Sequence, residues 1–210
     1  MLILISPSKI DVPAGTVIRV PATWQDYQQV ANRRGDSSLP RIKYCNGEMR
    51  LMVPLPEHGK DASFIADFTK VLLDVQELEY DAFTPITMTL PEAGGIEPDY
   101  CFYIQNLARV RGKKRIDWQI DPPPDLVLEV DVTSYSNVDD YLPYQVPEVW
   151  MFKQDLLNIH RLDNAHYRLT TTSCYFPELE LQPLVAHYRQ IAYQQSTSQA
   201  IRQLRQQFSS

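Results

Sequence analysis

Hydrophobic and polar residues follow two periods along the chain, one typical of helices and one typical of strands. From Asp61 to about Gln76, apolar residues recur on one broad face with the helical period, which predicts the main core helix. Shorter helices are expected from Thr23 to about Arg34, at 138–145, from Leu184 to Tyr193, and from Ser196 onward. Thr23 is the expected N-cap of the first of these.

Segments with a period of two predict the strands. A β-hairpin is expected from Ile42 to Val53, because Asn46-Gly47 at its centre is a strong signal for a tight turn. Residues 91–95 are expected to form a loop. Other strands are predicted at 79–90, 100–105 and 126–131, followed by three antiparallel strands at 148–152, 156–162 and 167–171.

An early helix, mixed strands and late helices together predict an α/β (α+β) fold around one sheet. We expect a single domain over residues 1–210, because 210 residues suit one domain. Within it, residues 1–22 are expected to form an N-terminal arm or sheet edge. Residues 183–210 are expected to form a C-terminal helical extension.

The strand at 126–131 carries the most informative pattern. Its two faces differ sharply. Leu126, Leu128 and Val130 form an apolar face. The opposite face carries the carboxylates of Asp125, Glu129 and Asp131, together with Val127. Acidic residues are poor strand formers, and like charges on one face repel. Such a strand makes sense if a cation such as Mg²⁺ or Mn²⁺ neutralises it. A solvated acidic face is the alternative.

Further acids precede this strand. Pro98-Asp99 opens the strand at 100–105 in the same way that Pro124-Asp125 opens the acidic strand. Glu48 directly follows the Asn46-Gly47 turn. Many metal-dependent nucleases assemble a cation site in this way, from a Pro-Asp step and a second strand that bears a glutamate.

Composition limits the classes of function. The net charge of −6 argues against a protein that coats nucleic acid, but it does not exclude a nuclease. A phosphate-binding surface would have to be a local patch, either at 109–115 or at Arg202 and Arg205. We expect no membrane span, because no apolar run is long enough. The three widely spaced cysteines suggest no disulfide framework, and a reducing cytoplasm is the simplest compartment.

Several short motifs resemble, in their order, the signatures of the Uma-type restriction endonuclease family of bacteria. They span residues 44 to 152, and the ordered set is more specific than any single motif. The motifs are Tyr44-Cys45-Asn46-Gly47-Glu48-Met49 with Pro54-Leu55-Pro56-Glu57-His58, then Glu97-Pro98-Asp99, Pro124-Asp125-Leu126-Val127-Leu128-Glu129-Val130, and Val146-Pro147-Glu148-Val149-Trp150.

This resemblance implies the PD-(D/E)xK restriction-endonuclease-like fold, a central mixed sheet flanked by helices. It also implies a DNA endonuclease that depends on Mg²⁺ (or Mn²⁺). Asp99 and Glu129 match the motif acids, Asp125 matches the aspartate that begins the acidic strand, and Glu48 matches the acid of the first signature. These four are the expected metal ligands, and the first three are the expected catalytic residues. His58 matches the histidine of the first signature, with no role assigned.

The chain departs from the motif at one position. Two residues after Glu129 the simple motif has lysine, whereas this chain has Asp131. That lysine normally orients the attacking water and stabilises negative charge. Candidates to replace it are Lys113, Lys114 and Lys153.

Three functions therefore stay open. The first is a Mg²⁺-dependent endonuclease that acts on DNA, and the second is a non-catalytic interaction module that keeps the fold. The third is an unrelated acidic protein, which requires Asp99 and Glu129 to lie apart. Nucleases of this class often act as pairs, so a homodimer is also expected. Its contact could be the apolar stripe of Ile201, Leu204 and Phe208, which could equally pack on its own domain.

Overall fold

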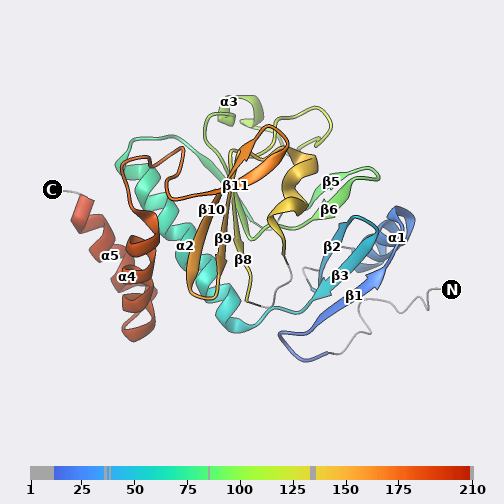
Figure 1. Cartoon of the computed structure of the whole chain (residues 1–210), viewed down its shortest axis with the longest axis horizontal. Helices are drawn as coiled ribbons and strands as arrows, with labels where there is room; N and C mark the ends of the chain where they lie inside the picture. The colour runs from blue at the N-terminus through green and yellow to red at the C-terminus, as the bar shows by residue number, and fades with distance from the viewer. Residues whose placement is uncertain (1–11, 36, 38, 85, 133–135, 209–210) are drawn as a thin grey trace.

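The computed structural model describes residues 12–35, 37, 39–84, 86–132 and 136–208. It contains two β-sheets flanked by helices, with two helices at the C-terminal end (Figure 1). The predicted α/β class is confirmed. A second, smaller sheet joins the mixed sheet that was expected.

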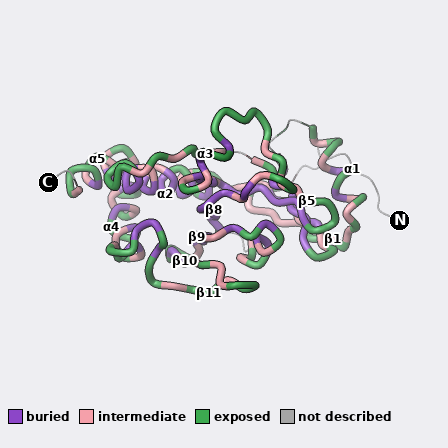
Figure 2. The backbone as a smooth tube through the Cα atoms, turned by 90° about the horizontal axis from the view of Figure 1, so that it is seen from above, coloured by how far each residue is buried: buried purple, intermediate pink, exposed green. Residues whose placement is uncertain are grey.

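The larger sheet is mixed. Its strands lie in the order β11 (His166–Thr170), β10 (Leu156–Asp163), β9 (Glu148–Lys153), β8 (Leu126–Val130), β7 (Tyr100–Tyr103) and β4 (Asp81–Phe83). The acidic strand β8 is central, parallel to β9 and antiparallel to β7. All its residues are buried, as the purple tube in Figure 2 shows. Its acidic face is therefore not solvated.

The smaller sheet is antiparallel, in the order β1 (Val17–Pro21), β3 (Glu48–Met52), β2 (Arg41–Cys45), β6 (Gly94–Ile96) and β5 (Met88–Leu90). The predicted hairpin is confirmed as β2 and β3. Asn46 and Gly47 adopt positive φ values of 51° and 77°, as a two-residue hairpin turn requires. The expected N-terminal edge is present as β1, whereas residues 1–11 lie outside the described part.

Two sequence-based expectations were wrong, the second only in its extent. The single strand predicted at 79–90 is divided between β4 and β5, which belong to different sheets. Pro85 lies between them in the sequence and lacks the N–H that a continuous ladder needs. The loop predicted at 91–95 is present as a turn at 91–93, but it ends earlier than predicted, because β6 begins at Gly94.

The expected helices are present in their predicted order, and one further short helix, at 107–110, was not predicted. The helices are α1 (Trp24–Arg34), α2 (Pro56–Val75), α3 (Leu107–Val110), the 3₁₀ helix η2 (Val138–Tyr144), α4 (Leu181–Gln194) and α5 (Thr197–Phe208). Thr23 caps α1 through a capping box with Asp26. The core helix α2 begins at Pro56, earlier than predicted, because proline is well tolerated in a first helical turn. None of the helices in the described part is both long and apolar enough to span a bilayer.

The main core lies between the larger sheet and helices α2, α4 and α5 (Figure 1). The apolar face of β8 packs there against the phenylalanines of α2. A second apolar cluster covers the opposite face of the sheet and includes Val127, Cys101 and Tyr141. Glu129 and Asp99 point to this second side, because residues alternate between the two faces of a strand.

The C-terminal helices are fixed to α2. Arg189 on α4 donates from Nε and Nη2 to the buried Asp61 carboxylate on α2, at 2.8 and 2.9 Å. Leu204 is buried in the main core, and Ile201 and Phe208 pack against it. The apolar stripe therefore packs on its own domain. The homodimer itself stays a prediction.

Gly95 is needed where α1 approaches β6. A Cβ atom at this position would lie 2.2 Å from the buried ring of Tyr27. We predict that Gly95→Ala lowers the free energy of unfolding by about 1–3 kcal/mol through this overlap. Urea unfolding measures the change. Gly59→Ala, in α2 with no atom within 4 Å, is the matched control. It should be neutral or stabilising by up to about 1 kcal/mol, and equal losses in both variants would contradict the prediction.

Candidate active site

Asp99, which directly precedes β7, lies beside Glu129 of the neighbouring strand β8. Tyr100 of β7 pairs with Leu128 of β8, so the next position of the antiparallel register sets Asp99 opposite Glu129. The Val130 N–H donates to Asp99 Oδ2 at 2.7 Å. Both acids are buried, with 3% and 2% of their surface exposed. The hypothesis that required these acids to lie apart is therefore wrong.

Two bases hold Asp99. Arg41 at the start of β2 donates to Asp99 Oδ1, and His58 Nε2 in the first turn of α2 lies 3.3 Å from Oδ2. Burial alone would raise the pKa of Asp99, but Arg41 and His58 outweigh it, and this pKa lies below its ordinary value. Burial alone would lower the pKa of His58, but Asp99 outweighs it, and this pKa is raised. Arg41 and His58 together therefore favour the ionised form of Asp99.

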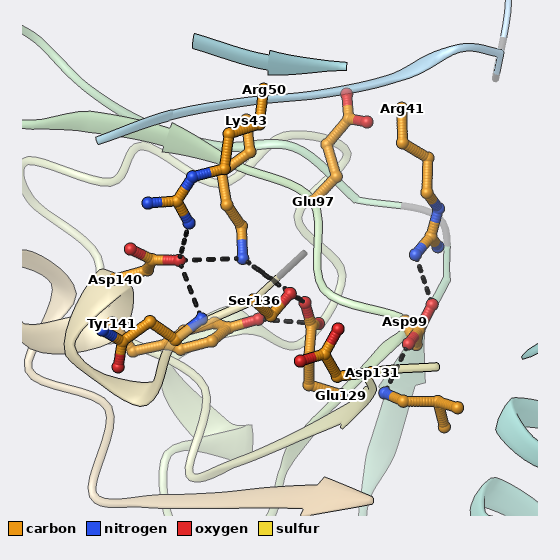
Figure 3. A network of polar contacts seen from close by, with 12 residues as sticks. Arg41, Lys43, Arg50, Glu97, Asp99, Glu129, Asp131, Ser136, Asp140 and Tyr141 are labelled. Atoms are coloured by element: carbon orange, nitrogen blue, oxygen red, sulfur yellow. Dashed lines mark hydrogen bonds and ion pairs between the residues drawn. The ribbon is translucent and has the colours of Figure 1, made fainter. Parts of the chain in front are cut away.

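Three donors surround the Glu129 carboxylate (Figure 3). The Tyr141 hydroxyl donates to Oε2 at 2.9 Å, and the Ser136 hydroxyl donates to Oε1. Lys43 Nζ lies 3.4 Å from the same Oε1. Burial, followed by the charge of Glu129, raises the pKa of Tyr141 well above its ordinary value, so its hydroxyl stays a donor.

Lys43 reaches Glu129 from β2, across the space between the two sheets. Its side chain is fully buried, and Nζ also lies 3.2 Å from Asp140 Oδ2 and 2.9 Å from Ser136 Oγ. Burial alone would lower the pKa of Lys43, but Glu129 and Asp140 outweigh it, and the pKa lies above its ordinary value. A charged ammonium is therefore held against the acid of the central strand.

The sequence analysis did not identify Lys43, although a signal for it exists. The Asn46-Gly47 turn fixes the hairpin register, which pairs Lys43 with Arg50. Two cations directly opposite each other repel unless an anion lies nearby. This pair therefore predicts acids close to the inner face of the hairpin, which Asp140 and Glu129 supply.

The lysines that the sequence suggested lie elsewhere. Lys153 Nζ on β9 contacts the buried Asp131 carboxylate at 3.0 Å, next to the pair but not on Glu129. Lys113 pairs with Asp121. Neither contacts Glu129, whereas Lys43 does.

Asp125 is not brought to the Asp99–Glu129 pair. It lies four residues before Glu129 along β8, about 13 Å away at the rise of an extended strand. Its Oδ2 accepts from the N–H groups of Ile104 and Asn106 at 2.7 and 2.9 Å, and Oδ1 accepts from the Asn106 side chain at 3.0 Å. These bonds tie the loop after β7 to the start of β8, which is a structural role.

Glu48 also lies outside the pair. It begins β3, and its half-exposed carboxylate accepts from Arg50 Nε at 2.6 Å and from Arg19 Nη1 at 3.4 Å. It contacts Arg50, which in turn contacts Asp140 at 3.0 Å. Glu48 is thus joined to the site only through the arginine.

Each buried acid around the site meets a base. The pairs are Glu97 with Arg34, Asp99 with Arg41, Glu129 with Lys43, Asp140 with Arg50, and Asp131 with Lys153. The charges of these pairs cancel within the protein. A metal ion bound by these acids would have to share their carboxylates with the bases.

The donor set suits Mg²⁺ better than a metal that needs a full protein cage. In the described part of the chain, no three His, Cys, Asp or Glu side chains gather closely enough to hold a metal. Mg²⁺ keeps several waters and usually takes one or two protein carboxylates together with phosphate oxygens. Asp99 and Glu129, neighbouring carboxylates from adjacent strands, fit that requirement.

Comparison with solved structures shows the same fold in a nuclease-like protein. The chain is similar to a putative nuclease belonging to DUF820 from Anabaena variabilis ATCC 29413, with a TM-score of 0.56 and 15% sequence identity. The match covers 79% of this chain and 97% of that one. At this identity the likeness shows the fold alone.

The sequence also matches a family model. Residues 24–194 match the model of the Uma2 family, described as "Putative restriction endonuclease". This range contains Lys43, Asp99 and Glu129, and it covers more than half of the chain. The protein therefore belongs to the Uma2 family, which confirms the resemblance found in its motifs. A comparison with curated proteins finds no match.

Removal of the Lys43 charge should destabilise the protein strongly. Lys43→Met leaves the buried carboxylates of Glu129 and Asp140 without this cation, so we predict a loss of about 3–5 kcal/mol in the free energy of unfolding. Chemical denaturation measures it. Lys70→Met, which removes a partly exposed pair with Asp67 on α2, is the control and should cost about 0–1 kcal/mol. A loss at Lys43 no larger than this would contradict the buried pair.

Proposed function

We propose that the protein is a metal-dependent endonuclease that hydrolyses phosphodiester bonds in DNA at the Asp99–Glu129 pair. The observation that carries this proposal is the convergence of two acids and a lysine from three strands. Asp99 at the start of β7 neighbours Glu129 of β8, and Lys43 Nζ of β2 lies 3.4 Å from Glu129. Membership of the Uma2 family supports the same reaction class.

Lys43 supplies the ammonium that the simple motif would place two residues after Glu129. Its raised pKa keeps it charged near neutral pH. A fixed positive charge in a buried site stabilises negative charge that develops on a phosphate during hydrolysis. The motif chemistry is thus retained although Asp131 occupies the usual position of the lysine.

Asp99 and Glu129 would hold Mg²⁺ or Mn²⁺. The metal, when bound, would polarise the phosphate and provide an activated water as the nucleophile. The protein groups prepare the acids: Arg41 and His58 favour the ionised form of Asp99, and Tyr141 fixes the orientation of Glu129. Asp125 and Glu48 are left out of this set because of where they lie. Asp125 is about 13 Å from Glu129 along β8, and Glu48 contacts Arg19 and Arg50 at the start of β3.

Cellular context is a further part of the proposal. Cys45, Cys101 and Cys174 are all free thiols, which suits a reducing compartment such as the cytoplasm.

Loss of either acid should abolish cleavage. We predict that Glu129→Gln and Asp99→Asn each lower the rate of plasmid cleavage in Mg²⁺ by about 10²-fold or more, the scale of a lost electrostatic contact in a transition state. Asp67→Asn, a half-exposed acid of α2, is the control and should cleave as the wild type does. Thermal melts verify that the variants fold. Unchanged cleavage by a folded Glu129→Gln protein would overturn the assignment.

A second candidate is a non-catalytic module that keeps the fold for binding. The five buried acids around the site that pair with bases favour this candidate, because such a network is neutral without a metal.

Calorimetric titration with Mn²⁺ separates the two candidates. The nuclease predicts saturable binding at millimolar Mn²⁺ or below, and this binding should disappear in Glu129→Gln and persist in Asp67→Asn. Absence of binding in the wild-type protein would favour the module.

A further inference from the structure

Three cations form a row across the smaller sheet. The strand registers pair Arg19 of β1 with Arg50 of β3, and Arg50 with Lys43 of β2. Residues directly opposite each other lie on the same face of a sheet. Side-chain exposure falls along the row from 47% at Arg19 to 14% at Arg50 and 0% at Lys43. The row therefore leads from the surface to Glu129.

Like charges at directly opposed positions destabilise a sheet. Here acids offset part of that cost: Glu48 contacts Arg19 and Arg50, and Asp140 contacts Arg50 and Lys43. These acids bind the inner part of the row and the edge of the hairpin. Neither acid lines the groove that the outer end of the row faces.

A groove lies between this row and the strands β9 to β11. It has a volume of about 530 Å³, within the range of small-molecule sites. Its cationic and titratable residues are Arg19, Arg50, Lys153 and His160, and its polar residues are Ser136, Asn137 and Asn158. None of the described residues that line it is an aspartate or a glutamate. In a chain with 26 acids and 20 bases, such a lining is unusual.

Two residues that line the groove contact acids at or beside the candidate active site. Ser136, at one end, donates its hydroxyl to Glu129 (Figure 3). Lys153 contacts Asp131, the acid that follows the Glu129 strand. A polyanion in the groove would therefore lie against side chains that contact Glu129 and Asp131.

We propose that this basic groove binds the sugar–phosphate backbone of DNA next to the bond to be cleaved. The proposal rests on the proposed function, and it names the surface that holds the substrate. Arginine, lysine and amide side chains supply the contacts that proteins make to phosphates, which fix the position of a nucleic acid without reading its sequence. Arg19 and Lys153 are the more exposed cations and meet the backbone first.

The basic segments that the sequence suggested lie elsewhere. Arg111 pairs with Glu79, and Lys113 pairs with Asp121, in the region of α3. Arg202 and Arg205 line a separate hollow on α5 beside Asp67. Figure 1 shows α3 and α5 far from β1. Arginines in these two segments therefore serve as controls for the arginine of the groove, because they carry the same side chain outside it.

Fluorescence anisotropy with a labelled DNA duplex in EDTA tests the groove. We expect Arg19→Gln and Lys153→Gln each to weaken binding about fivefold to tenfold, and to reduce the slope of log affinity against log salt by about 1. Arg111→Gln and Arg202→Gln should bind within about twofold of the wild type, because the salt-dependent term counts only phosphate contacts. Both groove positions are partly exposed, so these variants should fold, and thermal melts verify this.

The outcomes separate this proposal from the proposed function, because no metal and no cleavage are needed. Selective weakening at Arg19 and Lys153 supports the groove even if the protein never cleaves DNA. A wild-type protein that does not bind the duplex overturns the groove, and so does equal weakening in all four variants. Unchanged binding by Arg19→Gln and Lys153→Gln, in a protein whose cleavage needs Glu129, overturns the groove and leaves the nuclease intact.

Discussion

The ion pair between Lys43 and Glu129 is the interaction on which the rest of the site depends. Glu129 lies in the central strand of the larger sheet, where an isolated carboxylate would be costly to bury. Lys43 comes from the smaller sheet, so the pair also joins the two sheets. Asp140 and Ser136 share the same ammonium, which positions the helix that covers the site. Replacement of either charge therefore affects stability and chemistry together.

Two strand registers position the residues of the candidate site. The positive φ values of Asn46 and Gly47 make a two-residue turn, which fixes where Lys43 lies on the hairpin. The antiparallel register of β7 and β8 sets Asp99 opposite Glu129. Because a shift of one residue would turn each side chain to the other face, the site depends on both registers. Local turn chemistry thus determines the positions of groups that are far apart in sequence.

Much of the fold could be predicted from the sequence, because periodicity and turn signals act locally. The core helix, the hairpin and the acidic strand follow from such signals. The family resemblance pointed to Asp99 and Glu129, which the register of β7 and β8 places opposite each other, and their role stays a prediction. The second sheet could not be predicted, because pairing between distant strands leaves no local pattern. Lys43 was overlooked because a lysine on a hairpin strand is usually solvent-exposed, and only the packing of two sheets buries it. Asp125 looked equivalent to Asp99 in sequence, but a strand length separates it from Glu129.

The site combines a charge-balanced set of ion pairs with a donor set that suits Mg²⁺, and the central claim is that a metal joins this network at Asp99 and Glu129. A crystal structure of the protein soaked in Mn²⁺, with anomalous diffraction recorded at the manganese edge, tests this most directly. We expect an anomalous peak within coordination distance of both carboxylates. A structure in which Asp99 and Glu129 keep their contacts to Arg41 and Lys43, with no manganese peak beside them, would show that no metal joins the pair.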